Sequence, residues 1–125
     1  MSRSAFLLAA TAAALAAPAA AHHGNSAYDM TRETVVEGVV KAFEMGGAHG
    51  EIVLVSADAR TGVTIEAPPS AILARRGWTN ATLKPGDRIV VRLRPNRDGT
   101  PGGKAVEITT ARGQVVLPRV GPPFG

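Results

Sequence analysis

The feature of this sequence that most constrains its fold is a series of short β-branched segments separated by glycine- and proline-rich turns. Such segments are typical of the strands of a small sheet or barrel. Five strands are predicted, over residues 34–43, 51–56, 63–66, 88–94 and 104–109. Residues 113–117 could add a sixth. Charged and apolar residues alternate in 88–94, which indicates one wet face and one buried face. Gly38 marks a bulge or bend in the first strand.

One short helix is predicted between the third and fourth strands. Alanine and leucine dominate residues 71–76, Ser70 is a suitable N-cap, Gly77 ends the helix, and Pro68-Pro69 ends the strand before it. A helix at this place in a strand-rich chain is typical of OB folds. We therefore predict an all-β fold with one short helix, a small antiparallel five- to six-stranded OB-like barrel. A β-sandwich is the alternative, but it needs about seven strands.

The start of the chain has the plan of a secretory signal peptide. A short basic start is followed by an apolar run over residues 5–17 and by the small residues Ala19 and Ala21 ahead of the predicted cleavage site. A membrane anchor is the alternative, but a run of roughly 13 residues is shorter than the roughly 20 that span a bilayer. We expect a periplasmic or secreted protein with no transmembrane segment after processing.

The chain divides into four predicted parts. These are a signal peptide over residues 1–21, an N-terminal arm over 22–33, an OB-like β-barrel domain over 34–117 and a flexible proline-rich tail over 118–125. A chain of 125 residues builds one small core rather than two. The sequence has no cysteine, so the domain folds without disulfides and cannot use thiol chemistry.

The histidines are the residues that point most directly to chemistry. Cleavage after Ala21 would leave His22 and His23 at the new N-terminus, where the α-amine and the imidazoles form a chelate that suits copper, nickel or zinc, copper first. His49 lies in a glycine-rich loop after the first strand, with Met45 as a soft ligand for Cu(I). We predict a transition-metal site if these residues converge. The simpler interpretation is a solvated terminal pair and a surface histidine.

Other functions follow from other residues. The net charge of +4 and the scattered arginines are consistent with an OB module that binds an anion or an oligomer. The simpler interpretation is a solvated basic face. The arginines are Arg75, Arg76, Arg88, Arg92 and Arg94. A passive subunit of an envelope complex, with an unknown protein partner, is a third candidate. The scarcity of aromatic residues and the predicted export argue against nucleic acid. No complete catalytic constellation is present, so we expect no enzyme activity.

Several segments together resemble a known family. They are His22-His23 followed by Tyr28-Asp29, residues 38–44, His49, and the stretch over residues 70–78 and 82–87. This pattern resembles the exported bacterial proteins of domain-of-unknown-function family 6152, from His22 to about Leu117. Members typically carry Trp-Thr-Asn-Pro-His-Ala-Trp in the first loop. Residues 45–51 here read Met-Gly-Gly-Ala-His-Gly-Glu, so His49 matches and both tryptophans are absent.

A looser likeness concerns the fold and three residue types. The layout is similar to that of periplasmic OB-fold copper chaperones, which bind Cu(I) with histidine, methionines and a nearby tryptophan. His49, Met45 and Trp78 are the same residue types, but their spacing does not reproduce that family's ligand pattern. Trp78 itself is expected to fill the barrel core.

Overall fold

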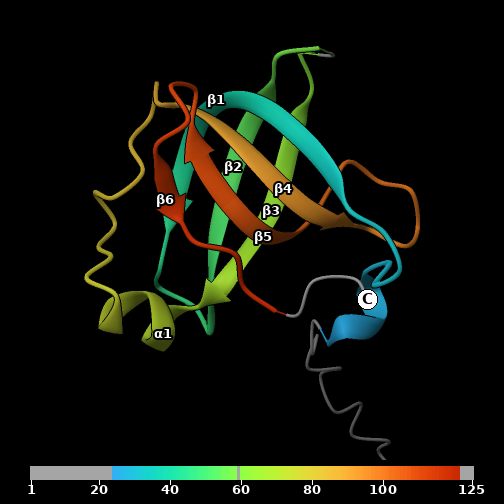
Figure 1. The fold of residues 1–125 in the computed structure, drawn as a ribbon, viewed down its shortest axis with the longest axis horizontal. Helices are drawn as coiled ribbons and strands as arrows, with labels where there is room; N and C mark the ends of the chain where they lie inside the picture. Colours follow the sequence, from blue (N-terminus) through green and yellow to red (C-terminus); the bar gives the residue numbers. More distant parts are fainter. Residues whose placement is uncertain (1–23, 59, 122–125) are drawn as a thin grey trace, which may run out of the picture.

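The computed structural model describes residues 24–58 and 60–121 of the chain. These residues form six strands, one α-helix and one short 3-10 helix (Figure 1). The elements in chain order are η1 (Asn25–Ala27), β1 (Thr34–Glu44), β2 (His49–Ser56), β3 (Gly62–Pro69), α1 (Ser70–Arg75), β4 (Arg88–Pro95), β5 (Gly102–Thr110) and β6 (Val115–Leu117).

The strands close into a barrel. Their order is β3-β2-β1-β4-β5-β6, and an additional parallel pairing between β3 and β5 joins the two sides. The long strand β1 makes this possible because its first half pairs with β4 and its second half with β2. The result is a closed five-stranded barrel with β6 added at β5, and α1 lies between β3 and β4 in the chain. The predicted OB-like fold class is confirmed.

Gly38 has a different role from the predicted one. The irregularity in β1 falls between Val40 and Ala42, so the expected bulge at Gly38 is slightly misplaced. Gly38 instead pairs with Ser56 on one side and Ile89 on the other. A Cβ at this position would lie 2.4 Å from the carbonyl oxygen of Val55. Glycine is therefore needed here for the close approach of β2 rather than for the bulge.

The boundary between β3 and α1 also differs from the prediction. Strand β3 continues through both prolines, and Pro69 is the register partner of His49. Proline is tolerated because β5 pairs with β3 only as far as Glu66, so the prolines have a strand neighbour on one side. The cap residue of α1 is Pro69, and Ser70 is the first helical residue, with no side-chain capping bond.

The core is filled from the inward-facing residues of all five barrel strands. Trp78, just after α1, is buried and meets Phe43 edge-on, with ring centroids 5.6 Å apart and an interplanar angle of 75°. The predicted core position of Trp78 is confirmed. Leu73 is the buried residue of α1, and it anchors the helix over the end of the barrel.

The described part of the N-terminal arm is docked on the barrel. Tyr28 forms an isolated bridge with Asn96, in the loop after β4. The Arg97 guanidinium donates to the carbonyl oxygens of Ser26 and Tyr28, at 3.1 and 3.0 Å. At the other end of the chain, Arg119 forms a bidentate ion pair with Glu33. The contacts of Asn96 and Arg97 hold η1 beside the loop between β4 and β5.

Because Gly102 lies where the barrel closes, substitution of this glycine should destabilise the fold. Its φ is +111°, and an added Cβ would lie 2.0 Å from the Thr64 carbonyl oxygen in the parallel β3–β5 pairing. Gly102→Ala should lower the free energy of unfolding by roughly 2–4 kcal/mol, from backbone strain and steric overlap together. Urea denaturation measures this. Gly62→Ala is the matched control, because its Cβ would meet nothing within 4 Å; equal losses in both variants would contradict the prediction.

Candidate functional site

A large pocket lies on the outer face of β2 and β3. It has a volume of about 810 Å³, and its walls come from the first residues of β2, from β3, from the β4–β5 loop and from the N-terminal arm. The face formed by the second and third strands, with the adjoining loops, is where OB folds generally bind their ligands. The pocket of this chain therefore occupies the usual binding face of its fold.

Glu66 of β3 is the central charged group of this pocket. Its side chain is 11% exposed, and its Oε2 accepts a hydrogen bond from the hydroxyl of Tyr28. Its Oε1 lies 3.2 Å from Nε2 of His49, in a geometry that does not align the two atoms for a hydrogen bond. Within the described residues, this buried oxygen has no hydrogen-bond partner. A buried carboxylate oxygen left in this way is costly, and a cation or donor in the pocket would relieve the cost.

Tyr28 holds the other side of the same carboxylate. Burial raises the pKa of Tyr28 well above its ordinary value, and the hydrogen bond to Glu66 and the negative charge of Glu66 raise it further. All three effects disfavour the tyrosinate, which would be a second negative charge beside that of Glu66. Tyr28 therefore remains a hydrogen-bond donor to Glu66 at neutral pH.

The register of the sheet places acidic side chains in one row. Glu44 of β1 is the partner of Glu51 in β2, and Glu51 is the partner of Glu66 in β3. Cross-strand partners point to the same face, and like charges in such positions repel each other. The β2–β3 register shifts between His49 and Glu51, but Nε2 of His49 lies 3.2 Å from Oε1 of Glu66, which places His49 on this face. The row ends at the pocket, so its repulsion also favours a cation there.

The lining of the pocket is acidic although the whole chain is basic. Glu51, Glu66 and Asp98 line it, and none of its described lining residues is lysine or arginine. Hydrogen bonds from the side chain and backbone of Thr100 lower the pKa of Asp98, which keeps that carboxylate ionised. In a chain of net charge +4, this lining is a local concentration of negative charge.

The predicted metal ligands fall in different places. His49 is in the pocket, but it is the first residue of β2 rather than part of the glycine-rich loop in which it was predicted. The side chain of Met45 instead packs, partly buried, against the hydrophobic core, and its backbone N–H donates to Oδ1 of Asn80. His22 and His23 lie outside the described residues, but Gly24, which follows them in the sequence, lines the pocket. Across residues 24–58 and 60–121, no three potential ligands among His, Cys, Asp and Glu come close enough to form a metal site by themselves.

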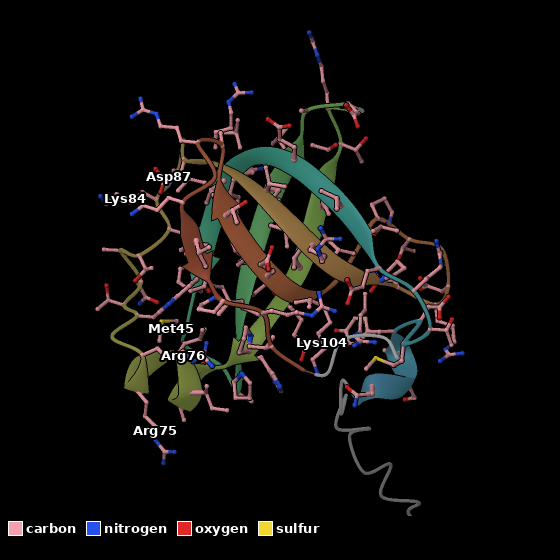
Figure 2. All side chains as sticks on the ribbon, viewed as in Figure 1. Met45, Arg75, Arg76, Lys84, Asp87 and Lys104 are labelled. Atoms are coloured by element: carbon pink, nitrogen blue, oxygen red, sulfur yellow. The ribbon has the colours of Figure 1, made fainter. Side chains whose placement is uncertain are left out.

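The arginines of the alternative prediction are spread over the barrel. Arg88 and Arg92 are exposed on β4, whereas Arg94 on the same strand is buried and donates to the carbonyl oxygen of Met30 at 2.6 Å. Arg75 and Arg76 are at the end of α1. Figure 2 shows the side chain of Arg75 extending away from the barrel. Two of the five, Arg76 and Arg94, do line a common pocket, which is separate from the one beside His49.

Sequence reasoning missed Glu66 and Tyr28 as site residues. A partial signal for Glu66 was present, because its neighbours Ile65 and Ala67 are the buried residues of an alternating strand and Glu66 must then face outward. For Tyr28 there was no such signal. Its position over Glu66 depends on the docking of the arm, which joins residues 38 positions apart in the sequence.

A small closed OB-type barrel with an acidic pocket on its β2–β3 face defines the class of this protein. The chain belongs to the family of unknown function DUF6152, whose family model matches residues 10–105. The predicted family resemblance is thereby confirmed.

Other comparisons add little to this assignment. A search of curated proteins found no match. Among solved structures, the chain is similar to the ZRD-deleted mutant of TiaS in complex with agmatine, with a TM-score of 0.46 and 18% identity over 73% of this chain. The chain spans 23% of that TiaS chain. In the described part of the present chain, no helix is long and apolar enough to cross a membrane.

The Tyr28–Glu66 contact predicts an unusual tyrosine titration. Tyr28 is the only tyrosine of the chain, so the ultraviolet absorbance of tyrosinate reports on it directly. Its midpoint should lie above the ordinary value of 10.0, and Glu66→Gln should lower the midpoint by removing the neighbouring charge. Because the folded pKa is raised, stability from this contact is present below about pH 10 and lost as pH rises through the folded value.

Glu51→Gln is the control for this titration. Glu51 lines the same pocket, but the hydroxyl of Tyr28 bonds to Glu66. A midpoint near the ordinary value, or an equal shift in both variants, would show that Tyr28 does not bond to Glu66 in solution.

Proposed function

We propose that this protein is an exported, periplasmic or secreted binding protein that holds a divalent transition metal ion, Cu(II) first, in the pocket beside His49 and Glu66. The observation that carries the proposal is the buried Oε1 of Glu66, which lacks a hydrogen-bond partner among the described residues and lies 3.2 Å from Nε2 of His49. Both atoms can bind one ion, and the acidic lining of the pocket favours a cation.

The chemistry of the two groups supports this choice of ligand. An imidazole nitrogen and a carboxylate oxygen are a ligand pair that suits Cu(II), Ni(II) and Zn(II), and the usual affinity order favours copper. A hydrogen bond from a neighbouring donor commonly orients a ligating carboxylate. The hydroxyl of Tyr28, bonded to Oε2, would do this for Glu66 and leave Oε1 for the metal.

Two described ligands are too few for a tight site, and the N-terminal arm is the proposed source of the others. His22 and His23 precede Gly24, a residue of the pocket wall, and two residues reach at most about 7 Å along the chain. Signal cleavage after Ala21 would add the α-amine of His22. Met45 packs on the core, so the proposed ligands are nitrogen and carboxylate groups, which suit Cu(II) better than Cu(I).

The proposed role is binding rather than catalysis. The raised pKa of Tyr28 keeps its hydroxyl protonated, so it is not poised as a base or a nucleophile. The proposed partner is therefore the metal ion itself, with a protein that delivers or receives it as a further candidate.

The proposal predicts a copper titration that depends on both pocket residues. Protein purified from the periplasm, with an intact mass that begins at His22, should bind one Cu(II) with nitrogen ligation visible by electron paramagnetic resonance. His49→Gln and Glu66→Gln should each weaken binding by at least about tenfold in calorimetry, as is common when one group of a metal site is lost. Acid should release the metal, because an imidazole that gains a proton cannot bind a metal ion, and the usual pKa of imidazole is about 6.5.

Controls separate the site from the fold. Glu37→Gln removes an exposed carboxylate on β1 that does not line the pocket, and it should leave copper affinity unchanged. His49→Gln should leave the unfolding temperature of the metal-free protein nearly unchanged, since this histidine is partly exposed and contributes little to the core. Correctly cleaved protein that binds copper weakly, or equally well without His49, would overturn the proposal and direct the search to a protein partner.

A further inference from the structure

A second pocket, of about 350 Å³, has the opposite charge from the first. It lies between the junction of β3 with α1, the N-terminal arm, β5 and the segment after β6. Three cationic side chains line it, Arg76, Arg94 and Lys104, and none of its described lining residues is aspartate or glutamate. The chain thus separates an acidic pocket from a basic one, and the arm contributes residues to both.

The rest of this second pocket is largely apolar. Pro68, Pro69, Val106 and Val120 contribute to its wall. Ile72 of α1 also lines it and is 43% exposed, one of few large apolar side chains of the described residues that remain so accessible. An exposed apolar side chain that borders a concave surface is a common feature of ligand-binding grooves.

The cations come from three different elements. Arg76 follows α1, Arg94 is in β4 and Lys104 is in β5. Figure 2 labels Arg76 beside α1 and Lys104 on the side of the N-terminal arm. Barrel closure therefore gathers charges that are far apart in the sequence.

Hydrogen bonds position two of these cations. Arg94 is 7% exposed, and its guanidinium donates to the Met30 carbonyl oxygen. The ammonium of Lys104 donates to Oδ1 of Asn25 at 3.0 Å. The amide oxygen of Asn25 is neutral, so it orients the Lys104 ammonium without cancelling its charge. Positive charge beside an apolar wall is complementary to an anion that carries an apolar body.

We propose that this second pocket binds a small amphipathic carboxylate, with its anionic head at Arg76 and Lys104 and its hydrocarbon body against Ile72 and the two prolines. The volume is near the lower end of the roughly 300–1,000 Å³ that is typical of small-molecule sites, so the ligand is a short-chain or medium-chain acid. Arg94 is buried, and its guanidinium already donates to the Met30 carbonyl oxygen, so it is not one of the proposed contacts of the anionic head. This inference does not depend on the copper site.

The test uses the purified full protein and three probes that separate charge from apolar contact. Octanoate carries both features, acetate carries only the head and octan-1-ol only the body. In calorimetric titrations at low salt, octanoate should bind at least about tenfold more tightly than either of the others, because it alone satisfies both halves of the pocket. Binding should weaken as salt rises and should not respond to a metal chelator.

Variants assign the binding to these residues. Arg76→Gln and Lys104→Gln should each weaken octanoate binding by about tenfold, the scale of one charge-assisted hydrogen bond. Ile72→Ala should weaken it less, through lost apolar contact. Arg75→Gln is the matched control, since Arg75 is the neighbouring arginine on α1 and does not line the pocket. Copper affinity should be the same in all four variants, which distinguishes this site from the pocket beside His49.

Three results would overturn the proposal. One is the absence of octanoate binding in a protein that is folded by circular dichroism. Another is equal affinity for octan-1-ol, which would show that the cations do not contribute. The third is an equal loss in Arg75→Gln and Arg76→Gln, which would indicate a general charge effect rather than binding in this pocket.

Discussion

The rest of this structure depends on the close approach of three strands at the start of β5. Gly102 sits against the backbone of β3, and Gly103 sits against that of β4, where a Cβ would lie 2.0 Å from the Arg94 carbonyl oxygen. Because neither glycine has a side chain, β5 can pair with both strands and close the barrel. Closure also brings β3, β5 and the loop that precedes Gly102 together; residues of β3 and β5 line both pockets, and the loop lines the pocket beside His49. The same local constraint therefore shapes the core and both candidate sites.

The distribution of charge is the second property that organises the molecule. A net charge of +4 would by itself suggest an anionic partner, but the charges are sorted by position. Register aligns Glu44, Glu51 and Glu66 across three strands, while Arg76, Arg94 and Lys104 gather on the other pocket. The docked N-terminal arm adds Tyr28 to the first pocket and Asn25 to the second. A segment without long regular structure thus completes two sites of opposite charge on one small barrel.

Much of the fold could be predicted because its signals are local. The alternation in residues 88–94, the turn residues between strands and Gly77 after α1 each act over a few neighbouring positions. Two local signals were misleading. Pro68-Pro69 did not end β3, because proline is disfavoured only where a neighbouring strand needs its missing N–H, and β5 has already diverged from β3 at that point. Gly38 is required by the backbone of β2, a contact that local sequence does not reveal.

The sequence by itself determined the family, the order of strands and helix, and the buried position of Trp78. It also identified His49 as a candidate site residue. Only the tertiary structure decided which groups surround His49. Strand register brings Glu66 beside His49, and the docked arm places Tyr28 on Glu66. Met45 packs against the core although it is close to His49 in sequence. The physical reason is that hydrophobic alternation and turn chemistry operate over a few residues. A binding site depends on side chains that the closure of the barrel brings together from distant parts of the chain.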